Sequence, residues 1–432
     1  MSKKKLLVIG SGGREDCLVW KILQSPQTKE VYCCPGNAGI AKRAKCVNID
    51  FSSSFDPLIK FAREKNIDMT VVGPEAPLVD GIVDAFEENG LKIFGPKKEA
   101  AMLEGSKSFA KEIMNSANIP TAKAEIFDNK NDALKFIKSL TPPIVIKADG
   151  LSAGKGVSIN KNIEEARTLL SSIFDEKVFG DAGKKVIIEE FLSGEEASVL
   201  AFVDGNTILP LDSSQDHKPI YDGDKGPNTG GMGAYSPAPI VDNNMLNEIQ
   251  KTIFEPIINE LKKRVIIYKG ILYAGIMVTK DGPKVLEFNC RFGDPEMQAV
   301  LPRLENDIVE LFEATINNKL SSIELKWKEE WAVCVIAASD GYPGKYEKGK
   351  VINNLELIKE NNETIIFYAG VAEKDKKLIT NGGRVLGLTT LDILLSDAIK
   401  KNYEYLKRIH FDGIYYRRDI GYRALKFEHK IF

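Results

Sequence analysis

Short apolar runs alternate with amphipathic stretches along the first hundred residues of the chain. The apolar runs have the length of buried strands, and apolar residues recur at helical spacing in the stretches between them. The predicted strands are Leu6–Ile9, Val31–Cys34, Met69–Val72 and Ile93–Phe94, and the predicted helices cover residues 15–23, 55–64 and 78–88. This alternation predicts an α/β unit with a doubly wound parallel sheet.

Beyond residue 100 the pattern predicts a mixed α+β arrangement. A helix over residues 100–119 leads into strands that surround a glycine-rich loop, and a long amphipathic helix is predicted over 245–263. The remaining predicted helices are 132–140 and 163–173, and the remaining strands are 186–192, 197–203 and 208–211. From Trp331 onwards the chain is rich in strands with short loops. The whole pattern therefore predicts a multidomain protein.

Composition narrows the class of protein. The chain has 432 residues, of which 43% are hydrophobic and 28% charged, a balance typical of a soluble globular protein with roughly two to four domains. A net charge of −2 argues against a nucleic-acid partner, and no apolar run approaches the ~20 residues that span a bilayer. Six cysteines without a CxxC pair favour reduced thiols in a cytoplasmic protein.

A loop with two lysines lies between two predicted strands in the stretch Pro143–Val157. Lys147 ends the first strand, and three glycines and Lys155 follow before Val157. Glycines allow backbone N–H groups to approach an anion, and the two ammonium groups can neutralise phosphate oxygens. The spacing is not that of a Walker A loop, because Asp149 and Gly156 occupy its first glycine and its Ser/Thr positions. We interpret the stretch as a phosphate loop of another kind; a plain turn is the alternative.

The first strand ends in a second glycine turn, which contains Gly12, Gly13 and Arg14. The turn resembles a dinucleotide fingerprint, but Glu15 occupies the position of the third glycine. A glycine turn that opens a helix can bind a phosphate through backbone N–H groups, with Arg14 beside it. The alternative is a tight strand-to-helix turn without a ligand.

A predicted hairpin near residue 290 carries candidate metal ligands. Its strands are residues 271–278 and 284–292, with a turn at Asp281-Gly282. Glu287, Asn289 and Arg291 are two residues apart, which places them on one face of the second strand. An acid, an amide oxygen and a guanidinium suit a Mg²⁺–phosphate site. A solvated strand face is the alternative.

Residues 226–233, Gly-Pro-Asn-Thr-Gly-Gly-Met-Gly, predict an irregular loop, and they belong to a distinctive stretch that runs to Pro237. Other distinctive stretches are residues 12–15, 35–39, 72–78, 103–107, 147–157, 214–218, 287–296 and 381–385. In order along nearly the whole chain, these stretches resemble phosphoribosylamine–glycine ligases (glycinamide ribonucleotide synthetases), a family of the ATP-grasp superfamily. The run Gly-Pro-Asn-Thr-Gly-Gly-Met-Gly-Ala-Tyr, residues 226–235, is very specific.

The resemblance implies a fold and a reaction. It implies an N-terminal doubly wound domain (1–103), an ATP-grasp domain (104–330) with a lid subdomain (about 122–192), and a C-terminal domain (331–432). The family ligates glycine to 5-phosphoribosylamine with ATP and Mg²⁺ or Mn²⁺, in purine biosynthesis. The implied intermediate is glycyl phosphate, and the implied assembly is a monomer or a weak homodimer.

The resemblance also assigns residues. Lys107, Lys147 and Lys155 would bind the nucleotide phosphates, Glu189 and Leu192 the adenine, and Glu196 the ribose. Glu287 and Asn289 match the metal ligands, and Arg291, Lys147 and Asp212 are the candidate catalytic residues. Arg291 would receive the glycine carboxylate or the transferred phosphoryl group. The candidate substrate-binding residues are Gly12, Gly13, Arg14, Asn37, Glu75, Asn228, Thr229, Gly230, Gly382, Gly383 and Arg384.

One residue departs from the family pattern. The family's first glycine turn continues with a histidine, whereas this chain has Asp16. A carboxylate 4 Å from a phosphate charge would cost roughly 4 kcal/mol at an effective dielectric constant near 20. We therefore expect Asp16 to point away from the phosphate.

Two other classes of function remain open at this point. One is a different ATP-grasp ligase, because the lysines and the metal-binding strand are common to the superfamily. The other is a regulatory protein that binds a nucleotide or a nicotinamide cofactor at the N-terminal glycine turn. Substrate dependence would distinguish the first, and a thermal shift with NAD the second.

Overall fold

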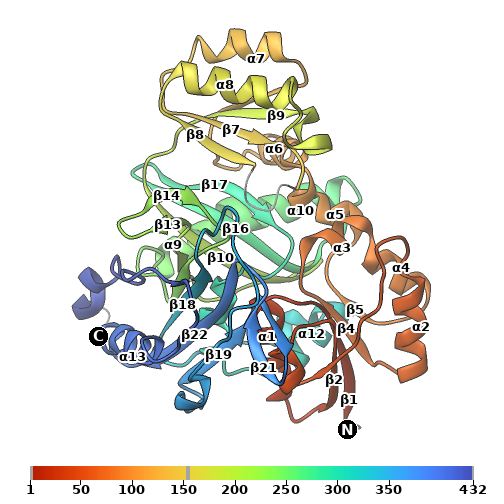
Figure 1. Cartoon of the computed structure of the whole chain (residues 1–432). Coiled ribbons are helices and arrows are strands. Elements are labelled where there is room, and N and C mark those ends of the chain that lie inside the picture. Colours follow the sequence, from red (N-terminus) through yellow and green to blue (C-terminus); the bar gives the residue numbers. More distant parts are fainter. Residues whose placement is uncertain (1–2, 152–155, 431–432) are drawn as a thin grey trace.

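In the computed structural model, which describes residues 3–151 and 156–430, the N-terminal region is a parallel sheet covered by helices (Figure 1). The strand order is β3-β2-β1-β4-β5, and Leu7 and Ile9 of β1 pack into one core while Leu6 and Val8 pack into another. A strand buried on both faces is expected in a doubly wound sheet, so the predicted fold class is confirmed here. The elements are β1 (Lys4–Gly10), α1 (Gly13–Leu23), β2 (Thr28–Pro35), β3 (Lys45–Cys46), α2 (Asp56–Lys65), β4 (Met69–Val72), α3 (Glu75–Asp80), α4 (Ile82–Glu88) and β5 (Ile93–Phe94).

Two predicted helices are each divided into two. The helix expected over 78–88 is interrupted by Gly81, whose φ of +97° separates α3 from α4. The helix expected over 100–119 becomes α5 (Lys98–Gly105) and α6 (Lys107–Ser116), because Ser106 is extended and its hydroxyl caps the N–H of Phe109. Among the described residues, no helix combines the length and the apolar character needed to cross a bilayer.

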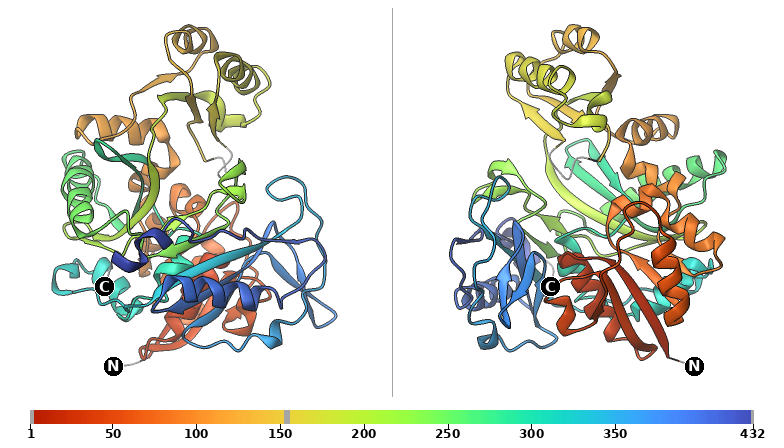
Figure 2. Two further views of the ribbon diagram at one scale, coloured as in Figure 1. Left: turned by 90° about the vertical axis from the view of Figure 1, so that its left-hand side faces the viewer. Right: turned by 45° about the vertical axis from the view of Figure 1, so that its right-hand side comes forward.

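A small antiparallel sheet with two helices projects from the rest of the molecule as a lid (Figures 1 and 2). Its strand order is β6-β9-β7-β8, and α7 and α8 pack on one face around Ile144, Ile146 and Ile188. The lid consists of β6 (Ala124–Phe127), α7 (Lys130–Ile137), β7 (Ile144–Ala148), β8 (Val157–Asn160), α8 (Ile163–Phe174) and β9 (Val186–Glu190). The loop between β7 and β8 therefore joins neighbouring antiparallel strands.

A larger antiparallel sheet lies below the lid, in the strand order β11-β10-β16-β17. Its last strand ends at Asn289, so the expected extension to residue 292 is wrong and Cys290 and Arg291 lie in a bend. The long helix expected over 245–263 contains a π-helical segment at residues 250–254. The elements are β10 (Glu195–Asp204), β11 (Ile208–Pro210), α9 (Asn243–Ile249), η3 (Gln250–Phe254), α10 (Glu255–Lys263), β16 (Lys269–Thr279), β17 (Gly282–Asn289), α11 (Glu296–Val300) and α12 (Ile308–Ile316).

The C-terminal sheet takes strands from two distant parts of the chain. Its main path is β12-β15-β18-β22-β19, and β12 and β15 come from residues 215–236 rather than from the last hundred residues. The loop expected over 226–233 is partly regular, because β14 pairs with β13 in a two-stranded ribbon. The elements are β12 (Gln215–Asp216), β13 (Pro219–Tyr221), β14 (Lys225–Asn228), β15 (Gly233–Ser236), β18 (Trp331–Ser339), β19 (Thr364–Tyr368), β20 (Val371–Lys374), β21 (Lys377–Thr380), β22 (Arg384–Asp392), α13 (Leu395–Leu406) and β23 (Ile414–Tyr415).

A buried ion pair joins the N-terminal sheet region to the C-terminal sheet. Asp16 in α1 is fully buried, and its carboxylate lies 2.7 Å from Nη1 of Arg43 and accepts the backbone N–H of Tyr368 in β19. Arg43 also contacts Glu360. Burial raises the pKa of Asp16 to about 6, against the opposing effect of Arg43. Asp16 thus points away from the glycine turn, as expected, and serves as a contact between domains.

We expect Arg43→Met to lower the free energy of unfolding by about 3 kcal/mol at pH 8, because it leaves a buried carboxylate without its cation. The loss should be smaller at pH 5, since a carboxyl with a raised folded-state pKa is then largely protonated and needs no cation. Urea unfolding at the two pH values measures both effects. An equal loss at both pH values would contradict this account of the pair.

Candidate active site

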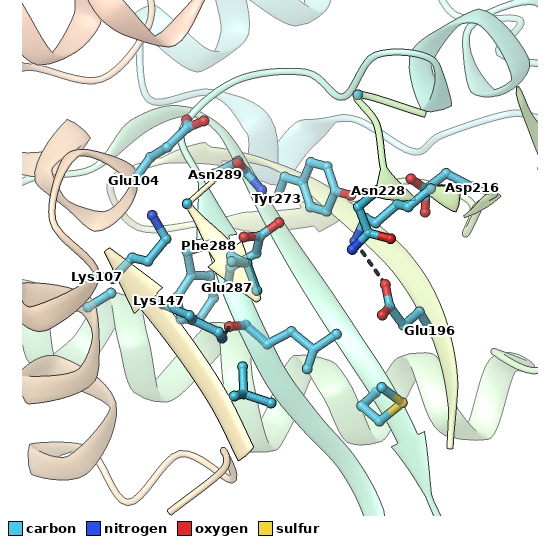
Figure 3. A pocket seen from close by; sticks show the side chains of 18 of the residues that line it. Glu104, Lys107, Lys147, Glu196, Asp216, Asn228, Tyr273, Glu287, Phe288 and Asn289 are labelled. Atoms are coloured by element: carbon cyan, nitrogen blue, oxygen red, sulfur yellow. Dashed lines mark hydrogen bonds and ion pairs between the residues drawn. The ribbon is translucent and has the colours of Figure 1, made fainter. Parts of the chain in front are cut away.

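A cleft of about 520 Å³ lies between the lid, the large sheet and the edge of the C-terminal sheet. The lid contributes Lys147 and Glu189, the large sheet contributes Glu287 and Asn289, and the C-terminal sheet contributes Arg384. Figure 3 shows Lys107 and Lys147 on one side of Glu287 and Asn289, with Asp216, Asn228 and Glu196 on the other side. The cleft therefore has a cationic end beneath the lid and a mixed, partly acidic end.

At the cationic end, a buried carboxylate is held between two lysines. The two oxygens of Glu189 lie 2.9 Å from Nζ of Lys111 and 2.7 Å from Nζ of Lys147. Lys111 also donates to Thr121 Oγ1 and to the Ala122 carbonyl. Each carboxylate oxygen has a second lone pair, so Glu189 can still accept a hydrogen bond from a ligand. The arrangement fixes Lys147 at the base of the lid.

A β-bulge at Leu286 explains why adjacent residues of β17 both face the cleft. Glu287 pairs with Gly275 and Val285 with Ile276, so Leu286 is the extra residue of this strand. Its carbonyl accepts a hydrogen bond from Lys147 Nζ at 3.0 Å. The alternation expected from the sequence breaks here, since Leu286 and Glu287 both line the cleft.

Apolar side chains next to the bulge form a small cluster that suits a flat ring. Leu286 packs with Ala122, Leu192 and Met277, and all four line the cleft close to the lysine pair. A purine is flat, and the polar groups on its edge would face Glu189 and the backbone near Leu192. This end of the cleft is therefore suited to bind the base of a nucleotide.

Glu287 is an ionised carboxylate surrounded by cations. Burial acts to raise its pKa, but Lys218, Lys147 and Lys107 outweigh burial and lower it. Asn289 lies on the same strand beyond it, and its amide oxygen accepts a hydrogen bond from Arg291. A carboxylate and an amide oxygen are hard ligands of the kind that Mg²⁺ shares with phosphate oxygens. The donor set fits a divalent ion that is bound together with a nucleotide.

Arg291 is half-buried and uses most of its hydrogen-bond donors within the protein. Its guanidinium lies 2.8 Å from Glu104 and 3.3 Å from Glu75, and it also donates to Asn289 and to the Phe292 carbonyl. A guanidinium has five N–H donors, so these four contacts leave one donor on Nη1. Burial acts to lower the pKa of Arg291, but Glu104 and Glu75 raise it, which keeps the group charged. Arg291 can therefore contribute charge and one further hydrogen bond.

A second, more open pocket of about 590 Å³ adjoins the first. Gly12, Gly13 and Asn37 from the N-terminal sheet line it, together with Asp294 and Arg384, which also line the first cleft. The glycine turn is closed by Glu15, whose carboxylate accepts the N–H groups of Ser11 and Gly12. The acid that breaks the dinucleotide fingerprint therefore stabilises the turn itself.

Family comparison gives a consistent match across the chain. Residues 4–104, 105–297 and 332–423 match the N domain, the ATP-grasp (A) domain and the C domain of phosphoribosylglycinamide synthetase. The chain is 52% identical to phosphoribosylamine–glycine ligase of Caldanaerobacter subterraneus subsp. tengcongensis over 417 residues, which cover 96% of this chain and 99% of that one. This chain belongs to the phosphoribosylglycinamide synthetase family.

Solved structures support the same fold. The crystal structure of phosphoribosylamine–glycine ligase from Thermotoga maritima has a TM-score of 0.85 and 35% identity, and covers 96% of this chain and 100% of that chain. The biotin carboxylase domain of Hydrogenobacter thermophilus 2-oxoglutarate carboxylase, solved with MgADP and bicarbonate, has a TM-score of 0.73 at 16% identity and covers 96% of this chain and 92% of that chain. The second likeness shows that the ATP-grasp fold extends beyond this synthetase family.

Most of the nucleotide-binding residues predicted for this synthetase line the first cleft together. Lys107 donates to the Gly150 carbonyl, and burial lowers its pKa. Asp149, which occupies the first glycine position of a Walker A loop, instead caps α6 by accepting the N–H of Ser108. The predicted nucleotide-binding residues that line the cleft are Lys107, Lys147, Glu189, Leu192 and Glu196. The predicted metal ligands Glu287 and Asn289 and the predicted catalytic residue Arg291 line it too. Lys155 lies outside the described residues.

The predicted substrate-binding residues divide between the two pockets. Arg14, Glu75, Asn228, Thr229 and Gly230 line the first cleft, and Gly12, Gly13 and Asn37 line the second. Arg384 connects the pockets, because it donates to the Gly230 carbonyl and lies 3.2 Å from Asp294. Gly382 and Gly383 do not line either pocket; Gly382 lies close to Gly370, and Gly383 lies close to the ring of Tyr342.

Two of the predicted site residues, Asn37 and Asp212, have polar side chains that are paired within the protein. Asn37 donates to the Ser11, Tyr368 and Ala369 carbonyls, and its oxygen accepts the N–H groups of Gly39 and Ile40. Asp212 is not among the residues that line the cleft, and its carboxylate lies 2.6 Å from Nη1 of Arg303. Asn37 therefore shapes its loop, and Asp212 is not brought together with Lys147 and Arg291.

Sequence reasoning missed several polar residues of the cleft. Lys111 lies one helical turn after Lys107, and that i, i+4 spacing is a signal that was available. Asp216 and Lys218 belong to a stretch already singled out by resemblance. Tyr273 and Glu296 reach the cleft from β16 and α11, and their contact, 2.6 Å from hydroxyl to carboxylate, depends on tertiary packing.

Proposed function

We propose that this protein ligates glycine to 5-phosphoribosylamine with ATP, giving glycinamide ribonucleotide, ADP and phosphate in purine biosynthesis. Its family membership and the names of its relatives support this reaction. The structural observation that carries it is the connection of the cationic cleft to the glycine-turn pocket through Arg384 and Asp294. A nucleotide and a sugar phosphate can thus occupy adjoining sites.

The chemistry requires activation of a carboxylate, which is a poor acylating agent by itself. We propose that the glycine carboxylate attacks the γ-phosphorus of ATP and forms glycyl phosphate. Transfer of a phosphoryl group needs mainly positioning and positive charge around its oxygens. Lys107, Lys147 and Arg291 supply that charge. The amine of 5-phosphoribosylamine then attacks the acyl carbon, and phosphate leaves.

The same proposal includes the metal ion, the domain boundaries, the cellular location and the assembly of the enzyme. Glu287 and Asn289 would hold Mg²⁺ or Mn²⁺, which would supply positive charge against the negative charge that develops on the transferred phosphoryl group. The proposed domains are 1–103, 104–330 with the lid at about 122–192, and 331–432. We further propose a cytoplasmic enzyme that is a monomer or a weak homodimer and whose partners are small molecules.

Release of ADP with each substrate omitted in turn tests the reaction. The full mixture of ATP, glycine, 5-phosphoribosylamine and Mg²⁺ should release ADP, and each omission should abolish the release. Replacement of glycine by bicarbonate or by other amino acids distinguishes this ligase from other ATP-grasp ligases. ADP release that needs bicarbonate instead of glycine would refute the proposal.

Isotope transfer tests the glycyl phosphate intermediate. If the glycine carboxylate attacks the γ-phosphorus, one of its oxygens must leave with inorganic phosphate. Glycine labelled with ¹⁸O in the carboxylate should therefore give one labelled oxygen in phosphate per turnover, measured by mass spectrometry. Unlabelled phosphate would show that water or an enzyme group receives the phosphoryl group first.

A further inference from the structure

Two carboxylates face the cleft without a hydrogen bond or an ion pair within the described parts of the chain, and their surroundings are opposite. Glu287 lies among Lys107, Lys147 and Lys218, which lower its pKa. Burial raises the pKa of Asp216 to about 7, and Glu296 and Glu196 act in the same direction, whereas Lys218 and Arg423 act to lower it. The groups that act on Glu287 are cations, whereas the two cations that act on Asp216 are opposed by two acids.

The backbone holds Asp216 firmly in this position. Asp216 is 6% exposed and pairs with Ala234 in the antiparallel ladder of β12 and β15. Its neighbour Gln215 is buried and donates to the Glu196 carbonyl. Because side chains alternate along an extended chain, Asp216 and Lys218 point to the same side, and both line the cleft.

The other acids at this end of the cleft already have partners. The Glu196 carboxylate lies 2.8 Å from Nζ of Lys218. The Glu296 carboxylate accepts hydrogen bonds from Tyr273 and Ser198. Asp216 is therefore a buried carboxylate, aimed into the cleft, that is available to bind a cationic ligand.

The proposed substrates include one small organic cation, the ammonium group of glycine. The glycine carboxylate must face the γ-phosphate, near the metal ligands and Arg291. Figure 3 shows Asp216 on the far side of Glu287 and Asn289 from Lys107 and Lys147. An amino acid whose carboxylate points toward the phosphates thus directs its ammonium group toward Asp216. Glu296 interacts electrostatically with both Asp216 and Arg291, so the two ends of this subsite share a neighbour.

We propose that the Asp216 carboxylate binds the α-ammonium group of glycine and thereby selects an amino acid over other small carboxylates. This inference rests on the proposed function and adds its amino-acid subsite. A second divalent ion is a poorer occupant, because Asp216 offers a single carboxylate and the charged Lys218 lies beside it. Asp216 is thus a specificity-determining residue that makes direct contact with the substrate.

Asp216→Asn tests the subsite, because it keeps the shape of the side chain and removes its charge. Loss of a charged hydrogen bond should raise the KM for glycine about 10- to 100-fold. The KM values for ATP and 5-phosphoribosylamine and the kcat at saturating glycine should change little. Calorimetry with glycine, in the presence of Mg²⁺ and a non-hydrolysable ATP analogue, should show the same loss of affinity without turnover.

Two controls separate the inference from folding and from the proposed function. Asp281→Asn makes the same chemical change on the exposed β16–β17 turn and should leave every constant unchanged. The melting temperature of nucleotide-free Asp216→Asn should equal or exceed that of the wild type, because a raised folded-state pKa means that the ionised carboxylate opposes folding. A structural role for Asp216 would instead lower the melting temperature.

The outcomes are distinct. If the wild-type enzyme releases no ADP with glycine, the proposed function fails. If the wild-type enzyme is active but the variant keeps its glycine KM and its calorimetric affinity, the ammonium subsite is wrong. A fall in kcat alone, or a shift in Mg²⁺ dependence in place of glycine affinity, would also overturn the inference, because each points to proton transfer or to metal binding.

Discussion

Lys147→Met should lower kcat/KM for ATP by about 100- to 1000-fold, which is the effect of removing one preorganised donor from a developing charge. Lys147 links the lid to the large sheet, since its ammonium group contacts both Glu189 and the Leu286 carbonyl. Methionine is similar in length but has no charge to offer a phosphate. Steady-state kinetics with varied ATP, together with calorimetric binding of MgADP, measure the loss.

Folding of the Lys147 variant can be checked separately. Glu189 keeps Lys111 as a partner in the variant, so the buried carboxylate is not left without a cation. Lys161→Met removes an exposed lysine from the same lid, just after β8, and should leave activity and nucleotide affinity unchanged. Wild-type affinity for MgADP in Lys147→Met would contradict the assignment of Lys147 to the nucleotide phosphates.

The N-terminal sheet was predictable because its signals are local. Met69–Val72 and Ile93–Phe94 are strands with the expected bounds, since apolar runs between helical stretches reflect burial on both faces of a sheet. Two helix breaks were not predicted, because each depends on the backbone conformation of a single residue. Gly81 has a positive φ, and Ser106 is an extended cap, and neither changes the hydrophobic pattern around it.

The cleft was less predictable, because long-range contacts decide which polar side chains face it. The bulge at Leu286 shifts the strand register and brings two adjacent residues to the same cavity. Asn37 has the residue type of a ligand-binding group, but five contacts within the protein use its amide. The sequence can identify candidate polar residues. The opposite pKa shifts of Glu287 and Asp216, however, depend on the charges and the burial around each carboxylate in the folded structure.

The different surroundings of Glu287 and Asp216 suggest which ligand each carboxylate binds. The cations around Glu287 favour an ionised carboxylate before any nucleotide binds, so a metal ion can enter together with ATP. Asp216 is poorly compensated until an ammonium group arrives. The same cleft can therefore present an anion to a metal ion and a second anion to the amino acid, although both side chains lie close to Lys218.

Glu287→Gln should reduce kcat about 100- to 1000-fold and raise the concentration of Mg²⁺ or Mn²⁺ needed for half-maximal activity. Glutamine keeps an oxygen ligand but removes the charge that would hold the ion between the protein and the phosphates. The lowered pKa of Glu287 means that its ionised form stabilises the fold above its unfolded-state pKa, so the nucleotide-free variant should melt at a lower temperature at pH 8.

Metal-free nucleotide gives the sharpest test of this role. ADP without metal should bind Glu287→Gln at least as tightly as it binds the wild type, because the variant has lost the negative charge that faces the phosphates. MgADP should bind the variant more weakly, so the two affinities move in opposite directions, which general damage to the cleft cannot produce. Glu248→Gln, on the exposed face of α9, is the matched control and should behave as the wild type. An unchanged metal requirement in Glu287→Gln would remove this residue from the metal site and leave Asn289 without its charged partner.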